Sequence, residues 1–172
     1  MKRILSILAF FLLSVVVTLA GVLTPLSAQE VETKNNDLTQ IQTEVQSMGF
    51  GQGVIAIFSN NIVIGLLSFV PIAGPVLGSY ILYNTGTYVA AQSITEGWPP
   101  ALVFLLMFIY PHVWLEFFAY SIGFAESIWL IRRITQHKII EELRRTGIYI
   151  AISAGLLVLG AVVEMAIIAT FS

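Results

Sequence analysis

Residues 101–130 decide the fold and read ALVFLLMFIYPHVWLEFFAYSIGFAESIWL. The stretch is almost wholly apolar, as a helix that crosses a bilayer has to be. As one straight helix it would measure about 45 Å, whereas the hydrocarbon core is about 30 Å thick. Pro111 removes a backbone donor and crowds the preceding turn. We therefore expect a kink, a break or a partly re-entrant segment near Pro111.

The composition of the whole chain extends this conclusion. Of its 172 residues, 57% are hydrophobic and only 10% are charged, whereas about 25% charge is usual in a soluble domain. The net charge of −2 and the absence of cysteine argue against a nucleic-acid partner, a disulfide framework and thiol chemistry. The expected surroundings of the chain are the lipid bilayer.

Four further stretches are apolar and long enough to cross the membrane. Together with residues 101–130 they predict an all-α, polytopic transmembrane helix bundle of about five spans, with the fourth span kinked or broken. The first stretch has a secretory signal as its alternative, because Leu26-Ser27-Ala28 loosely resembles a cleavage site, but its length favours a retained anchor. The four stretches are Ile4–Leu26, Val54–Ile72, Val76–Gln92 and Thr146–Thr170.

The basic residues set the orientation, because cytoplasmic loops carry an excess of lysine and arginine. Five spans put Lys2, Arg3 and a basic connector near residues 131–145 on one side, which predicts a cytoplasmic N-terminus in a multi-pass protein of the cell membrane. The connector is expected to anchor on anionic headgroups, with partner docking as the alternative. Its basic residues are Arg132, Arg133, Lys138, Arg144 and Arg145.

The chain divides into an N-terminal anchor over 1–28, an extracytoplasmic loop over 29–53 and a helical bundle over 54–172. Within the loop, apolar residues recur at helical spacing and predict a short amphipathic helix. Asp37 is its expected N-cap and Gly49 its expected stop. A solvated linker is the alternative. The apolar residues are Leu38, Ile41, Val45 and Met48.

Polar residues inside the spans are costly and therefore form a candidate buried polar site. His112 and Glu116 are four apart on one helical face, within reach of a direct hydrogen bond. Glu164 needs a partner or a proton, and Glu126 is expected to snorkel or to meet Arg133. The alternative is that the His–Glu pair only pins a kinked helix. The predicted site comprises Asn60, Asn61, Asn84, His112, Glu116 and Glu164.

Small residues four apart indicate close packing of helix backbones. These sets are Gly74 and Gly78, Gly86 and Ala90, Ala119 and Gly123, and Gly147, Ala151 and Gly155.

Several of these features together resemble the stage II sporulation protein M family of integral membrane proteins. They are Phe58-x-Asn60-Asn61, a Gly/Pro turn, Asn84, Pro111-His112-x-x-x-Glu116-x-x-Ala119 and Glu164, over roughly residues 58–169. The chain departs from the family pattern at Val113 and Thr85, where the family has glycine. The resemblance implies a membrane scaffold that gathers a peptidoglycan-degrading complex, whose hydrolytic activity would belong to its partners. Family members also occur in organisms that do not sporulate.

The sequence has no phosphate loop, dinucleotide fingerprint or nucleophile elbow, so we expect no enzyme, no catalytic residues, no cofactor and no metal. The first functional hypothesis is a non-enzymatic scaffold or accessory subunit that forms a homo-oligomer or joins a larger membrane complex. The alternative is a small transporter or channel with a buried His/Glu/Asn site. Whether these polar side chains converge in one cavity distinguishes the two hypotheses.

Overall fold

The computed structural model describes residues 2–137 and 139–171, and within them it contains seven helices and no strand. The fold class predicted from the sequence, an all-helical bundle, is confirmed. The helices are α1 (Lys2–Val22), α2 (Ala28–Ser47), α3 (Phe50–Ser68), α4 (Ala73–Glu96), α5 (Pro100–Met107), α6 (Pro111–Thr135) and α7 (Ile139–Phe171).

Three of these helices, α1, α3 and α7, are long and apolar enough to cross a membrane, and the bent pair α5 and α6 makes a fourth candidate. The stretch expected as the third span corresponds to α4, which has 24 residues but is not among these candidates. The bundle is therefore that of a membrane protein with three to four candidate spans.

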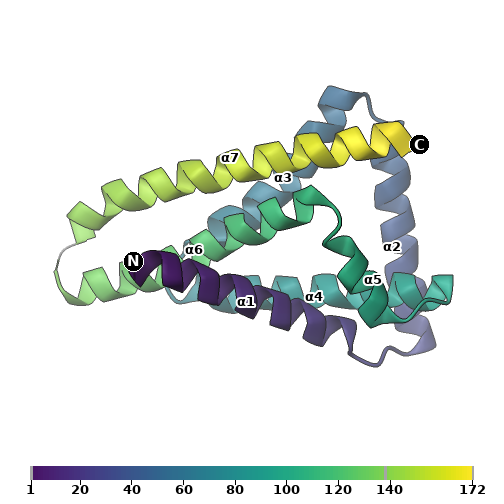
Figure 1. Cartoon of the computed structure of the whole chain (residues 1–172), viewed down its shortest axis with the longest axis horizontal. Helices are drawn as coiled ribbons and strands as arrows, with labels where there is room; N and C mark the ends of the chain where they lie inside the picture. The colour runs from purple at the N-terminus through teal and green to yellow at the C-terminus, as the bar shows by residue number, and fades with distance from the viewer. Residues whose placement is uncertain (1, 138, 172) are drawn as a thin grey trace.

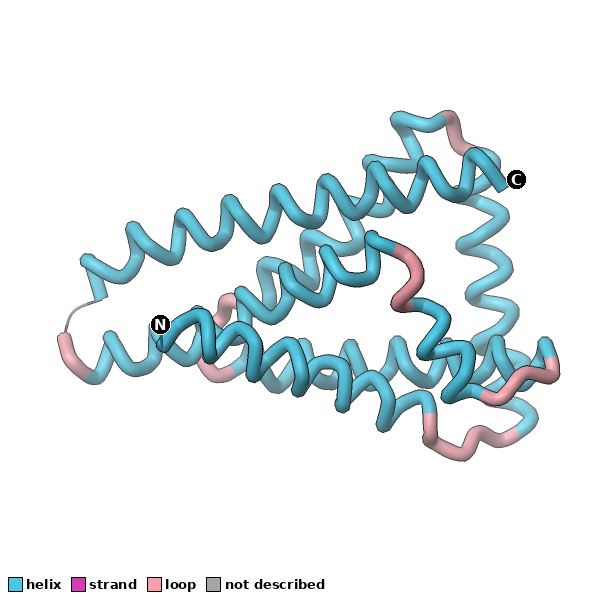
Figure 2. Tube along the Cα trace, in the orientation of Figure 1, coloured by secondary structure: helices cyan, strands magenta, loops and turns pink. Residues whose placement is uncertain are grey.

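The helices are arranged as a V (Figures 1 and 2). One arm contains α3 and α7, the other contains α1 and α4, and α6 lies between them and packs against both. The arms diverge toward the C-terminal end of α7, where α2 runs crosswise between them. We call this the wide end, and the opposite end, where α1 begins and α6 passes to α7, the narrow end.

Small and hydroxyl-bearing side chains are frequent in the interior of the bundle, whereas large apolar side chains cover much of its surface. Large aliphatic side chains of α1, such as Leu12, lie exposed, while Ser14 and Thr18 of the same helix are buried. The hydroxyl of Thr18 donates to the backbone carbonyl of Ser14, and that of Ser153 donates to Ala119 on the neighbouring helix at 3.1 Å. This pattern is the reverse of a water-soluble protein and is typical of helices packed in lipid.

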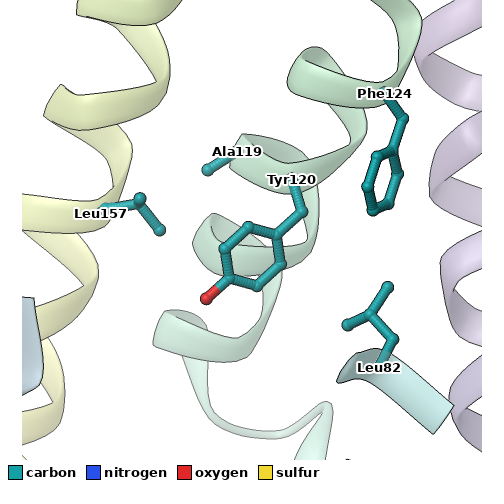
Figure 3. Close-up of a cluster of buried hydrophobic side chains, with 5 residues drawn as sticks. All are labelled: Leu82, Ala119, Tyr120, Phe124 and Leu157. Carbon is teal, nitrogen blue, oxygen red and sulfur yellow. The ribbon is translucent and has the colours of Figure 1, made fainter. Parts of the chain in front are cut away.

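The main apolar core lies where α6 meets its neighbours. Tyr120 of α6 lies on the side of Leu157 of α7, and Phe124 of α6 points toward Leu82 of α4 (Figure 3). Phe10 of α1 packs against Phe124 with its ring tilted, and the ring centroids are 6.0 Å apart. The central helix α6 therefore packs against both arms of the V.

Helix α6 is separated from α5 by a break with an angle of 86°. The break covers residues 108–110, immediately before Pro111. Its carbonyls are satisfied locally, because Met107 O accepts from Tyr110 N at 3.0 Å and Phe108 O accepts from Trp114 Nε1 at 2.8 Å. The chain can therefore turn sharply beside an apolar surface without leaving these acceptors unpaired.

A cluster of four charged side chains closes the narrow end. Glu126 and Glu142 are 0% and 1% exposed. Arg3 binds both carboxylates, donating to Glu126 Oε1 at 2.8 Å, and Arg133 lies 3.2 Å from Glu142. The expectation that Glu126 meets Arg133 or snorkels is wrong, because the first helix brings Arg3 to Glu126 instead.

Backbones approach most closely between α1 and α4. A Cβ atom on Gly21 would collide with the carbonyl of Tyr83, and one on Gly86 with the carbonyl of Thr18. The predicted packing role therefore holds for Gly86. It fails for Gly147 and Gly155, which have no neighbouring atom within 4 Å of an added Cβ.

Substituting Gly21 and Gly147 by alanine should change stability in opposite directions. Gly21→Ala forces α1 away from α4 and should lower the free energy of unfolding by about 1–3 kcal/mol. In Gly147→Ala the added Cβ has no neighbouring atom. This substitution should raise the free energy of unfolding by about 0.5–1 kcal/mol, because alanine favours the helix. Tryptophan fluorescence during denaturation in mild detergent measures both. Equal effects of the two substitutions would contradict the close α1–α4 contact.

Removing Arg3 should be much more costly than removing its neighbour. Arg3→Met leaves Glu126 without its main partner and should destabilise the fold by about 3–5 kcal/mol, as uncompensated buried charges do. Lys2→Met, at an exposed position, is the matched control and should have little effect. The double variant Arg3→Met/Glu126→Met should recover part of the loss in a double-mutant cycle, and additive losses would argue against the ion pair.

Candidate functional site

A cavity of about 770 Å³ lies at the wide end of the V, between α2, α3, α6 and α7. Five of the six residues predicted as a buried polar site line this cavity. They are Asn60 and Asn61 of α3, His112 and Glu116 of α6, and Glu164 of α7. Residues more than 100 positions apart in the chain therefore meet in one space, as the transporter hypothesis requires.

Asn61 and Glu116 connect α3 to α6 across the cavity wall. Asn61 Nδ2 donates a hydrogen bond to Glu116 Oε1 at 2.7 Å. Asn60 in turn donates to Asn61 Oδ1 at 3.4 Å. The amide pair therefore fixes one carboxylate oxygen of Glu116, whose carboxyl group still faces the cavity.

His112 does not make the predicted bond to Glu116. It stands in the first turn of α6, where its ring lies beside Tyr110, with centroids 5.8 Å apart. Its Nδ1 atom is buried, and no described atom forms a hydrogen bond with it. The expected His112–Glu116 pair is thus corrected: the break at residues 108–110 directs the imidazole toward Tyr110, and Asn61 takes the place of His112 as partner of Glu116.

Glu164 enters the cavity from α7, which lies in the same arm of the V as α3. Among the described side chains, none makes a hydrogen bond or ion pair with it. The approach of α7 to α6 is close here, because an added Cβ on Gly160 would lie 3.7 Å from Cγ of Glu116. Two carboxyl groups therefore border one space.

The lining of the cavity is acidic. Glu44 of α2 adds a third carboxylate to Glu116 and Glu164, and no described lysine or arginine borders the cavity. The remaining surface combines amide side chains with aliphatic ones such as Ile41, Ile57 and Ile167. Such a wall offers hydrogen-bond acceptors and negative charge to a small ligand and favours cations over anions.

A metal centre is not formed by these side chains as they stand. Within residues 2–137 and 139–171, no three His, Cys, Asp or Glu side chains are close enough to share an ion. The cavity therefore fits a solute that is held by a few separate polar contacts.

The sixth predicted residue, Asn84 of α4, lies outside the cavity. Its Oδ1 accepts from Lys34 Nζ of α2 at 3.1 Å. Lys34 also lies 4.1 Å from the ring centroid of Tyr88, whose hydroxyl donates to Asp37 at 3.3 Å. Asn84 thus belongs to the contact that fastens the first half of α2 to α4.

Helix α2 begins earlier than the sequence pattern predicted. Its N-cap is Ser27, which forms a reciprocal capping box with Glu30, whereas the expected cap Asp37 stands in mid-helix. Gly49 is the N-cap of α3. Hydrogen bonds from Ser27 lower the pKa of Glu30. The capping-box spacing Ser-x-x-Glu was the signal in the sequence for this start.

The predicted basic residues lie at the opposite, narrow end. Arg133 belongs to the charge cluster, while Arg132, Arg144 and Arg145 are exposed. Lys138 lies outside the described residues. The acidic helix α2 and the arginine-rich connector thus occupy opposite ends of the bundle, as the five-span reading requires.

Sequence reasoning missed several residues that shape the two ends. Arg3 was used only to predict the orientation and Glu142 was not singled out, although both are fixed in the narrow-end cluster. Glu44 and Tyr110, which line the cavity, carried no signal, because their place depends on how α2 and the break at residues 108–110 fold back over the bundle.

No protein-family model matches this chain, and no curated protein or solved structure is significantly similar to it.

Proposed function

We propose that this chain is a multi-pass protein of the cell membrane that binds a small cationic solute in the wide-end cavity, as a transporter or channel does. The observation that carries the proposal is the convergence of Asn61, His112, Glu116 and Glu164 in a cavity beside a broken helix. Half-helices that end near the middle of the bilayer are a common way to build solute sites in transporters.

The proposed topology has five crossings, with the N-terminus in the cytoplasm. Helix α4 is the crossing that this topology adds to the four candidate spans. Its 24 residues measure about 36 Å, and it packs along α1. The basic narrow end then faces the cytoplasm and the acidic wide end faces outward. In this topology the cavity lies toward the outer face of the membrane.

The charge of the lining supports a cationic solute. Three carboxyl groups and several amide oxygens face the cavity without a described basic side chain beside them. The aliphatic part of the wall suits an organic cation, because such a cation presents both charge and apolar surface. The described carboxyl groups and His112 do not come together in a group of three that could share an ion, which makes the cavity a poor site for a divalent metal.

A scaffold or accessory subunit, as the resemblance to the stage II sporulation protein M family implies, is the second candidate. The observation that favours it is α2, a helix of 20 residues none of which is buried. Its outward surface is free to bind another protein at the membrane surface. In this proposal the chain acts without catalysis, as a homo-oligomer or as part of a larger complex.

Thiol accessibility tests the cavity directly, because the chain has no cysteine. Ala56 lines the cavity and is small enough to replace with cysteine. In sealed vesicles, Ala56→Cys should react with membrane-impermeant methanethiosulfonates added from the wide-end side. The positively charged reagent should react about tenfold faster than the negatively charged one, because the acidic wall concentrates cations.

Two matched variants control this experiment. Gln40→Cys on the exposed surface of α2 should react with both reagents, and Ala125→Cys, fully buried in α6, with neither. If Ala56→Cys reacts no faster than Ala125→Cys, the cavity is closed to water. If the ratio of the two reaction rates is the same at Ala56→Cys as at Gln40→Cys, the prediction that the cavity prefers cations is wrong.

Solute movement is tested in proteoliposomes with methylammonium as the probe. Wild type should exceed empty vesicles, and Glu116→Gln and His112→Ala should each lower the rate by about tenfold or more, as expected when an intramembrane ionisable group that serves the solute path is removed. Glu30→Gln, at an exposed acidic position of α2 away from the cavity, should leave the rate unchanged.

Equal rates in all four proteins and in empty vesicles would contradict transport of this probe. If a second chain or a second copy also remains bound after purification in mild detergent, the scaffold candidate is the better explanation. A wild type that moves methylammonium while purifying alone would contradict the scaffold.

A further inference from the structure

The narrow end carries more positive charge than its own carboxylates neutralise. In sequence, residues 2–3 and 126–145 contain seven lysines and arginines but only three glutamates. The described carboxylates, Glu126 and Glu142, are engaged by Arg3 and Arg133. Arg144 and Arg145 are left exposed at the start of α7.

These two arginines border a groove on the side of the bundle. One part of the groove is lined by Arg3 of α1 and by Arg145, Ile148, Tyr149 and Ile152 of α7. A second part shares Arg145 and Ile148 and continues to Arg144 and Ile140. We call these residues together the basic groove.

The groove changes from charged to apolar along α7. Arg144, Ile148 and Ile152 are four residues apart, so they lie on one face of the helix, about 6 Å apart along its axis. Ile148 and Ile152 are 57% and 46% exposed. Tyr149 stands between the charged and apolar parts, as tyrosines do at the membrane interface.

Arg3 is held in position at this groove by contacts on several sides. Besides its two carboxylates, its guanidinium lies 5.0 Å from the ring centroid of Trp129 and 5.6 Å from that of Tyr149. The bottom of the groove is therefore rigid, whereas Arg144 and Arg145 at its rim are exposed and able to bind a ligand.

We propose that the basic groove binds an anionic phospholipid. The phosphate would lie between Arg144 and Arg145, whose planar guanidinium groups suit bidentate contacts to phosphate oxygens. One acyl chain would follow Ile148 and Ile152 toward the middle of the bilayer. An anionic head with an apolar tail in line with the helix axis matches both parts of the groove, and basic pockets of this kind at the cytoplasmic side are typical lipid sites.

This proposal is independent of the wide-end cavity, so either can fail alone. It goes beyond a general attraction of basic segments to the membrane surface, because it assigns the lipid to a groove in which Arg145 is the one basic side chain common to both parts. Arg132 has the same charge, but it lies over the ring of Trp129 at 5.4 Å and does not line the groove.

Native mass spectrometry of the full chain in mild detergent tests the proposal. The probes are phosphatidylglycerol and phosphatidylcholine with identical acyl chains. Wild type should retain phosphatidylglycerol preferentially, and Arg145→Gln should lower its retention by about fivefold, the effect of one basic residue near an anionic headgroup. Arg132→Gln, which changes the net charge equally, should retain the lipid as wild type does.

Three results would overturn the proposal. The first is equal retention of the two lipids by wild type. The second is an equal loss in Arg145→Gln and Arg132→Gln, which would mean unspecific attraction. The third is displacement of the lipid by glycerol 3-phosphate, which has the phosphate but no acyl chain and would indicate a site for a soluble phosphate.

Two further measurements complete the test. Thermal unfolding should give Arg145→Gln a slightly lower midpoint than wild type in the absence of added lipid, because Arg145 is exposed but lies close enough to Glu126 to attract it. Only wild type should gain stability from phosphatidylglycerol. A dimer mass that disappears in Arg145→Gln would overturn the lipid as occupant and assign the groove to a second copy of the chain.

Discussion

The inability of hydrocarbon to solvate polar groups governs this structure. Several buried hydroxyls donate to backbone carbonyls, as Ser153 does to Ala119, and the carbonyls of Met107 and Phe108 at the break before Pro111 accept from Tyr110 and Trp114. Large aliphatic side chains can then face outward, and small residues can bring backbones together inside. The arms of the V lie close together at the end where the buried charges are paired with each other, and they lie apart at the end where the carboxyl groups are not.

At the narrow end the charges neutralise each other, and the helices converge on Arg3, Glu126, Glu142 and Arg133. At the wide end Glu116 has one amide partner and Glu164 has no described one, and the arms separate around a cavity. The same chain thus contains a compensated and an uncompensated set of carboxyl groups. The compensated set joins α1, α6 and α7, and the uncompensated set borders the wide-end cavity.

Much of the fold could be read from local sequence. The apolar runs predicted helices, and Pro111 predicted the break, because both effects act within a few residues. The polar residues of α3, α6 and α7 were recognised because charge is rare in such helices. The partners of these residues were not predicted, since the hydrogen bond of Asn61 to Glu116 and the ion pair of Arg3 with Glu126 depend on how distant helices pack. The stripe of Gly147, Ala151 and Gly155 failed for the same reason: spacing shows that close approach is possible on a face, but not that a neighbour lies there.

The ion pair between Arg3 and Glu126 joins residues 123 positions apart, which has a consequence for biosynthesis. When α1 leaves the ribosome, neither of the two carboxylates that will hold its guanidinium exists yet. Until α6 and α7 are made, Arg3 has to remain in the aqueous interface, as long basic side chains at helix ends do. The first helix can thus enter the membrane early but reaches its final position only after α7 is made, because α7 supplies Glu142.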